Sequence, residues 1–209
     1  MIRKPLPGDQ RTLAGLLSMV VPDDPNTDSF ALQLATVPIP VARAGAFATG
    51  TAWVAEQSCA VTGLIVAAPP LSWLTSVPGV SRERCMLMSH CIVQCEYLAV
   101  EPAARGHHLG ALLTSHAAHH CTTRGFRLMT AAVTADNFHL IPYYRSMGWK
   151  PLPPGEGLGV TDAANSMVAW RPTEPDVVQM WMPLHNAVTA RRWPNQNGTV
   201  LAGVLPPAA

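Results

Sequence analysis

Apolar residues recur at helical spacing near the start of the chain. Between residues 8 and 20 they fall three or four positions apart, which predicts an amphipathic helix with Asp9 as a candidate N-cap. These apolar positions are Leu13, Leu16, Leu17 and Val20. The next stretch, PDDPNTD at 22–28, is rich in turn-forming residues, and 28–36 is weakly helical. Two short helices joined by an acidic turn are therefore expected.

Strand-like runs dominate the middle of the chain. TAWVAEQ at 51–57 and AVTGLIVAAPP at 60–70 are closely spaced and predict an antiparallel hairpin. CIVQCEYLAV at 91–100 and FRLMTAAVT at 126–134 are typical of strands, and 109–124 between them is typical of a helix. Such a crossover joins parallel neighbours, so the pattern predicts a mixed α/β fold.

The remaining segments follow the same rules less sharply. Residues 138–147 predict a short helix, and Gly125 and Gly148 stand where helices are expected to end. Residues 166–172 and 176–184 predict two further strands joined by a TEP turn, whereas 71–90 favours no single element. Periodicity is lost after residue 184, which predicts one domain over 1–184 and a C-terminal arm or tail over 185–209.

The composition and net charge limit the classes of partner that the chain is expected to bind. Hydrophobic residues make up 48% of the chain and the net charge is +1, so a core can form and nothing favours nucleic acid or a membrane surface as a partner. No apolar run approaches the roughly 20 residues that span a bilayer, and the N-terminal stretch lacks a signal-peptide cleavage site. The five cysteines include no CxxC pair, which favours free thiols in a reducing, cytoplasmic compartment.

The stretch YLAVEPAARGHHLGALL at 97–113 carries candidate chemistry. A strand passes through a short basic loop directly into a helix, and the first N–H groups of a helix lack internal partners and carry partial positive charge. Gly106 and Gly110 allow a close backbone approach, and Arg105 adds charge, so the loop is a candidate anion site. It matches neither the P-loop pattern nor the GxGxxG dinucleotide pattern.

This stretch resembles the acetyl-CoA loop of the GNAT-type N-acetyltransferases. Their signature is a strand ending in V-x-P, followed by R/Q-x-x-G-x-G/A at the start of a helix. The positions that match it are Val100, Pro102, Arg105, Leu109 and Gly110. A second family motif falls in register at the expected distance, in NFHLIPYYRSMGW, through Asn137, Tyr143, Tyr144, Gly148 and Trp149. The departure is His108, which replaces the first loop glycine and could crowd a pyrophosphate, point outward or donate a hydrogen bond to a phosphate.

The resemblance implies a fold and a reaction. The expected fold has a mixed, mostly antiparallel sheet, with helices on both faces and a central parallel strand pair splayed around acetyl-CoA. The expected activity is direct transfer of the acetyl group of acetyl-CoA to a primary amine of a small molecule. No metal is required. The residues implied to bind acetyl-CoA are Leu98, Ala99, Val100, Arg105, Gly106, His107, His108, Leu109, Gly110, Ala111, Asn137 and Tyr143.

Two residues are implied to carry proton transfers. Tyr144 falls on the family's general-acid position, and an ordinary phenol with a pKa near 10 is protonated at neutral pH. Glu96 is the candidate base, directly or through water, because it lies on the strand beside the expected thioester, where burial could raise its pKa. A core tyrosine and a solvent-facing carboxylate are the corresponding structural interpretations. For Asn137 the structural interpretation is helix capping.

Other groups leave alternatives open. His116 and His120 are four apart on the helix, a metal-binding spacing, but no third ligand is evident and a solvated face is favoured. Cys121 on the same helix is expected in the core. The acidic turn hints at a cationic acceptor, although a solvated turn explains it as well. A non-catalytic acyl-CoA-binding module, a protein acetyltransferase and a homodimer also stay open.

Overall fold

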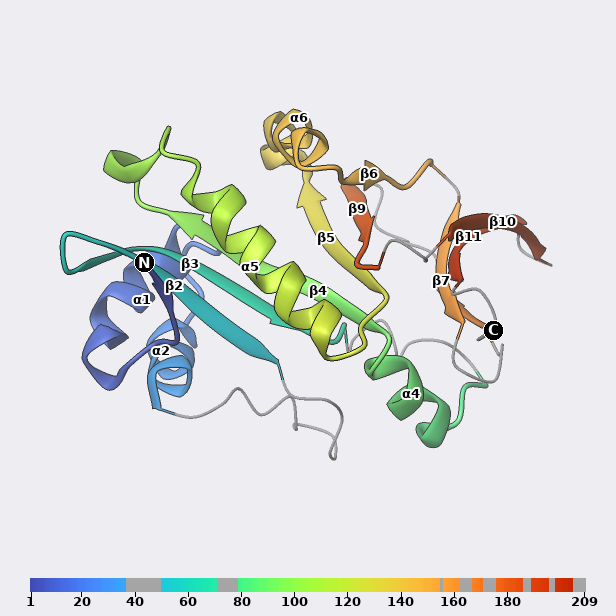
Figure 1. The fold of residues 1–209 in the computed structure, drawn as a ribbon, viewed down its shortest axis with the longest axis horizontal. Coiled ribbons are helices and arrows are strands. Elements are labelled where there is room, and N and C mark those ends of the chain that lie inside the picture. Colours follow the sequence, from blue (N-terminus) through green and yellow to red (C-terminus); the bar gives the residue numbers. More distant parts are fainter. Residues whose placement is uncertain are drawn as a thin grey trace. The chain divides into compact units, whose positions relative to one another are not determined.

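The structure is a computed structural model. It describes residues 1–36, 50–70, 79–154, 156–161, 167–170, 176–185, 189–195 and 198–204 (Figure 1). Contacts divide the chain into two compact units. The first unit is Met1–Ala68 with Cys95–His120, and the second is Pro69–Gln94 with Cys121–Ala209.

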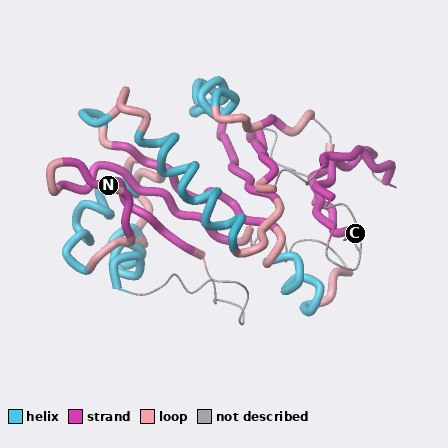
Figure 2. The backbone as a smooth tube through the Cα atoms, viewed as in Figure 1, coloured by secondary structure: helices cyan, strands magenta, loops and turns pink. Residues whose placement is uncertain are grey.

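The described helices lie between the start of the chain and Ser146, and strands alone follow from β6 onward (Figure 2). The helices are α1 (Gln10–Ser18), α2 (Thr27–Thr36), α4 (Arg82–Ser89), α5 (Leu109–Thr123) and α6 (Ile141–Ser146), with short 3-10 turns η1 (Pro7–Asp9), η2 (Pro102–Ala104) and η3 (Ala135–Leu140). The strands are β1 (Ile2–Arg3), β2 (Thr51–Gln57), β3 (Ala60–Ala68), β4 (Ile92–Val100), β5 (Leu128–Thr134), β6 (Lys150–Pro151), β7 (Gly157–Thr161), β8 (Met167–Trp170), β9 (Val177–Pro183), β10 (Thr189–Asn195) and β11 (Gly198–Val204). Strand order is β1-β2-β3-β4-β5-β9-β6 in one sheet and β10-β11-β7-β8 in the other.

The predicted hairpin forms the centre of the first unit. Strands β2 and β3 pair antiparallel, with Thr51 opposite Ala67. Ser58 and Cys59 form the turn with φ values of 47° and 65°, which is the left-handed geometry that suits the twist of a two-residue hairpin. A register shift at Ala55/Glu56 marks a β-bulge.

Helices cover both faces of this part of the sheet, as predicted. On one face α1 and α2 lie side by side and bury a leucine-rich cluster against β2, β3 and β4 (Figure 1). The members of this cluster include Leu13, Leu16, Leu17, Leu34, Val54, Leu64 and Ala99. Helix α5 covers the opposite face, because Trp53 contacts two of its histidines and a Cβ on Gly63 would lie 3.0 Å from Leu113. Alternation of side chains along each strand produces the two faces.

Asp9 lies at the N-cap position of α1 but does not cap the helix, so the capping expectation is wrong. Its side chain makes no cap hydrogen bond there. Instead, the Arg3 guanidinium donates hydrogen bonds to both carboxylate oxygens of Asp9, at 2.7 and 3.1 Å. It also donates to Glu56 at 2.5 Å. The backbone N–H of Leu6 adds a further bond to Asp9, so a charged pair between β1 and η1 outcompetes the cap.

The second unit contains the predicted parallel pair. The start of β4 pairs parallel with β5, from Ile92 opposite Leu128 to Gln94 opposite Thr130. Strand β9 extends the sheet antiparallel to β5, and the two-residue β6 pairs with β9 through Lys150 and Trp181. The mixed sheet with one parallel pair confirms the expected fold class.

The last strands form a separate sheet that the sequence did not predict. Strands β10 and β11 form a hairpin inside the expected arm, and β11 pairs parallel with β7. The two strands expected at 166–172 and 176–184 exist as β8 and β9, but they belong to different sheets. The TEP turn between them lies outside the described residues. The domain division at residue 184 stays a prediction.

Candidate active site

The central feature is the turn between β4 and α5. Strand β4 ends at Val100, and the N–H of Glu101 bonds the carbonyl of Thr62 on β3 at 2.9 Å. The turn η2 follows, and the first helical bond of α5 runs from Leu112 N–H to the His108 carbonyl at 3.0 Å. The N–H groups of residues 109–111 come before this bond, so they have no acceptor within the helix. Free N–H groups of this kind are what an anion site requires.

Two residues of this turn have left-handed backbone conformations. Gly106 has a φ of 84° and His108 a φ of 58°, whereas His107 is not in this region. The His108 position therefore explains the family's glycine, because only glycine adopts a positive φ without steric cost. Residues 105–108 are exposed, and a Cβ on Gly106 would meet no atom within 4 Å. The described surface of the turn is open.

Arg105 fixes the loop to the end of the strand. Its Nε donates to the Val100 carbonyl at 3.2 Å, although the side chain is exposed. This bond uses one nitrogen of a guanidinium that carries five N–H donors. The cation therefore sits at the turn by a specific contact.

The expected base lies on β4 and is exposed. Glu96 is exposed, which corresponds to the solvent-facing interpretation, and its role as a base stays a prediction. Leu98 and Val100 are half-buried and Ala99 is buried. Alternation along the strand places Glu96 on the face opposite Tyr97.

Tyr97 is the neighbour of Glu96 on β4, and the sequence analysis proposed no role for it. Its ring packs against Phe30 of α2 with centroids 5.5 Å apart. Burial raises the pKa of Tyr97, and the negative charges of Glu96 and Asp24 raise it further. Its position next to Glu96 in an alternating strand is the signal that could have identified it.

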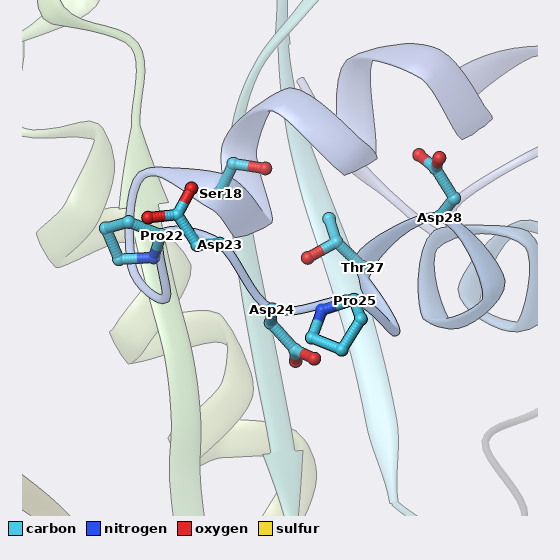
Figure 3. A pocket seen from close by; sticks show the side chains of 7 residues that line it. All are labelled: Ser18, Pro22, Asp23, Asp24, Pro25, Thr27 and Asp28. Carbon is cyan, nitrogen blue, oxygen red and sulfur yellow. The ribbon is translucent and has the colours of Figure 1, made fainter.

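An acidic pocket opens beside the α1–α2 loop (Figure 3). Its volume is about 490 Å³, and its lining side chains come from the end of α1, the loop and the start of α2. They are Ser18, Pro22, Asp23, Asp24, Pro25, Thr27 and Asp28. Asp24 also accepts bonds from the backbone N–H and side-chain amide of Asn26 at 2.9 and 3.1 Å, so it partly serves the turn itself.

The second predicted motif lies in the second unit. Tyr144 is 7% exposed, and its ring packs edge-on against Trp149 at 5.3 Å and Tyr143 at 5.8 Å. Asn137 is exposed, and its amide donates to Thr134 Oγ1 at 3.1 Å, next to the start of η3. Gly148 has a φ of 85° and ends α6 as predicted.

Of the histidine pair on α5, His116 is exposed and His120 is half-buried. His116 and His120 pack edge-on against Trp53, with ring centroids 5.4 and 4.9 Å apart. The ammonium of Lys4 lies 3.9 Å from the centre of the same indole ring. Cys121 is buried, as expected of a core residue. Within the described ranges, no three His, Cys, Asp or Glu side chains gather as metal ligands.

Solved structures with the same fold are numerous. An aminoglycoside 6'-N-acetyltransferase complexed with coenzyme A is 13% identical, with 88% of this chain and 97% of that chain covered and a TM-score of 0.56. A phosphinothricin acetyltransferase from Sinorhizobium meliloti in complex with AcCoA is 19% identical, with coverages of 88% and 87% and a TM-score of 0.56. A ribosomal-protein-alanine N-acetyltransferase from Brucella melitensis is 16% identical, with coverages of 88% and 99% and a TM-score of 0.54. At these identities the similarity shows the fold.

The amino-acid sequence identifies the family, which the similarity of fold alone does not. No curated protein matches the chain in sequence. No described helix is both long and apolar enough to cross a membrane. The sequence model of the Acetyltransferase (GNAT) family matches residues 40–149, more than half of the 209 residues and both predicted motifs. The chain therefore belongs to the acetyltransferase (GNAT) family, and the predicted family and enzyme class are confirmed.

Proposed function

We propose that the chain transfers the acetyl group of acetyl-CoA directly to a primary amine of a small, cationic molecule. The observation that carries this proposal is the open turn between β4 and α5, with left-handed backbone at Gly106 and His108. Its N–H groups, with the Arg105 guanidinium, suit the diphosphate of coenzyme A. Two of the three structures of similar fold described above were solved with coenzyme A or AcCoA.

The reaction needs three things from the chain. The amine nitrogen attacks the thioester carbonyl carbon, the C–N bond forms, and the C–S bond breaks as coenzyme A leaves as a thiolate. Backbone amides of Leu98–Val100 would polarise the carbonyl as its oxygen gains charge. Glu96 would take the proton that the ammonium of the acceptor must lose before attack, and Tyr144 would give its phenolic proton to the thiolate sulfur. The second proton that the nitrogen loses as the amide forms passes through water and restores the phenol. An exposed Glu96 can take its own proton through water.

The acceptor class is suggested by the acidic pocket. Three carboxylates line a volume of about 490 Å³, and Tyr97 beside it is within the electrostatic influence of Asp24. Such a pocket favours a positively charged amine by complementarity. Structural neighbours include an aminoglycoside acetyltransferase and a ribosomal-protein-alanine acetyltransferase, so a protein acceptor is the second candidate.

Binding and turnover can be tested separately. At about 100-fold saturation acetyl-CoA should add about 2.7 kcal/mol to stability, which is a rise of about 5–10 °C in melting temperature for a chain of this size. Thiol release is then followed with a panel of cationic and neutral amines. Tyr144→Phe should keep the thermal shift and lose most turnover. Persistent turnover in this variant would contradict the role of Tyr144, and absence of acetylation with any amine or peptide would favour a binding module.

The acceptor pocket has its own test. Asp28→Asn should raise KM for a cationic amine several-fold and leave KM for acetyl-CoA unchanged. Glu83→Gln is the matched control, because Glu83 is also an exposed acid in the first turn of a helix, α4, and does not line this pocket. Equal effects of the two substitutions would refute the acidic acceptor site.

A further inference from the structure

The ring of Tyr144 is held from one side by a more deeply buried aromatic residue. Trp149 is 2% exposed and packs edge-on against Tyr144, with centroids 5.3 Å apart and planes at 67°. Edge-to-face contacts of this kind stabilise a ring in one orientation beyond the burial of its area. Tyr143, only half-buried, contacts the same ring at 5.8 Å. Trp149 is therefore the more rigid of the two partners.

The backbone between the two residues enforces their contact. The Tyr144 carbonyl accepts hydrogen bonds from the N–H groups of Met147 at 3.0 Å and Trp149 at 3.2 Å. Gly148, with its φ of 85°, turns the chain so that Trp149 returns onto the helix it has just left. Directly afterwards β6 pairs with β9, so Trp149 lies between a helix end and the edge of a sheet. The backbone of Trp149 is therefore held by the end of α6 before it and by the β6–β9 pairing after it.

The indole N–H of Trp149 is buried, and no acceptor for it is present in the described part of the chain. A buried donor without a partner is unfavourable, so packing alone would be satisfied at least as well by phenylalanine. Trp181 on β9 is 3% exposed and has the same unpartnered indole N–H. Its ring lies under the Lys150 ammonium, 5.4 Å away, and makes no described aromatic contact with Tyr144.

We propose that Trp149 is a positioning residue, which holds the Tyr144 ring in the one orientation from which its hydroxyl can give up a proton. This inference rests on the proposed role of Tyr144 as the proton donor. Loss of an aromatic pair that biases one orientation lowers the fraction of molecules ready to react. The effect should appear in kcat, because the acetyl-CoA loop is formed by other residues.

The test compares equivalent substitutions at the two tryptophans. Trp149→Leu should lower kcat about two- to tenfold, the range that one aromatic pair supports. KM for acetyl-CoA should not change. Trp149→Phe, which keeps a ring and removes the unpartnered N–H, should restore most of kcat with little change in melting temperature. Trp181→Leu should lower the melting temperature in a similar way to Trp149→Leu and leave kcat unchanged.

The outcomes separate the two hypotheses. A normal kcat in Trp149→Leu, or an equal loss in Trp181→Leu, overturns the positioning role even when Tyr144→Phe is inactive. If Trp149→Leu does not fold, the Trp149→Phe variant decides. A large loss of kcat in Trp149→Phe contradicts the proposal, because this variant keeps an aromatic ring beside Tyr144. A fully active Tyr144→Phe refutes the proton-donor role itself, whatever the tryptophan variants do.

Discussion

His108 offers the most direct test of how the acetyl-CoA loop is built. It occupies a glycine position of the family motif with a φ of 58°, and its side chain is exposed. We therefore expect His108→Gly to stabilise the protein, although glycine usually weakens folded structure. The perturbation removes backbone strain and almost no packing.

The expected magnitude follows from two opposing effects. A left-handed conformation costs an L-residue about 1–2 kcal/mol, a cost that glycine does not have. Glycine gains more freedom in the unfolded chain, which costs about 0.4–1 kcal/mol of stability. The difference is a net gain of about 0–1.6 kcal/mol, centred at about 0.8 kcal/mol. For a chain of 209 residues this raises the melting temperature by about 1–4 °C.

The matched control is the preceding residue. His107 is equally exposed but its φ is not positive, so His107→Gly brings only the entropy cost and should lower stability by about 0.4–1 kcal/mol. Both variants are measured by reversible urea unfolding and by thermal melting. Opposite signs support the strain argument. A His108→Gly variant that loses as much stability as His107→Gly refutes it, because the backbone cost would then be absent.

Three further predictions concern the first unit. Hydrogen bonding to Arg3 lowers the pKa of Asp9, so its stabilisation is complete above the ordinary carboxyl pKa and is lost as pH falls through the lowered value. Asp9→Asn should cost about 1 kcal/mol or less after solvent screening and flatten that acid limb in urea unfolding. Burial, with the charges of Lys4 and His119, lowers the pKa of His116. Stability should therefore fall as pH decreases below about 6.5 through that lowered value, and His116→Gln should remove this slope in melting curves. Gly63→Ala should cost about 1–3 kcal/mol in unfolding free energy, because its Cβ would lie 3.0 Å from Leu113 and 3.3 Å from the Ala99 carbonyl; an unchanged midpoint would show that α5 shifts freely.

Periodic segments were predictable because one face of each is buried. Leu13, Leu16 and Leu17 all lie in the core, and the parallel pairing of β5 with the start of β4 follows from the intervening helix. The hairpin at 51–70 was predicted from two close strand-like runs, and the chain closes it with a left-handed turn. In these segments local pattern and tertiary packing agree.

Other features depend on residues far apart in sequence, so local patterns miss them. Asp9 looks like an N-cap, but Arg3 and Glu56 decide its partners, and Glu56 is distant along the chain. Strand β11 has a parallel partner in β7, about forty residues earlier, and periodicity within 185–209 could not reveal it. The packing of His116 and His120 on Trp53 is hidden for the same reason, since Trp53 belongs to the hairpin.

The two motifs differ in how much of their function is local. The loop after β4 is built by backbone conformation within a few residues, so its geometry follows from Gly106, His108 and the helix start. Tyr144 depends instead on side chains that meet through a tight turn and a sheet edge, with Gly148 making the turn and Trp149 the contact. Substitutions that keep backbone conformation should therefore spare the loop. At the tyrosine, where the geometry is held by ring contacts, a change that keeps the backbone but removes the neighbouring ring should still reduce turnover.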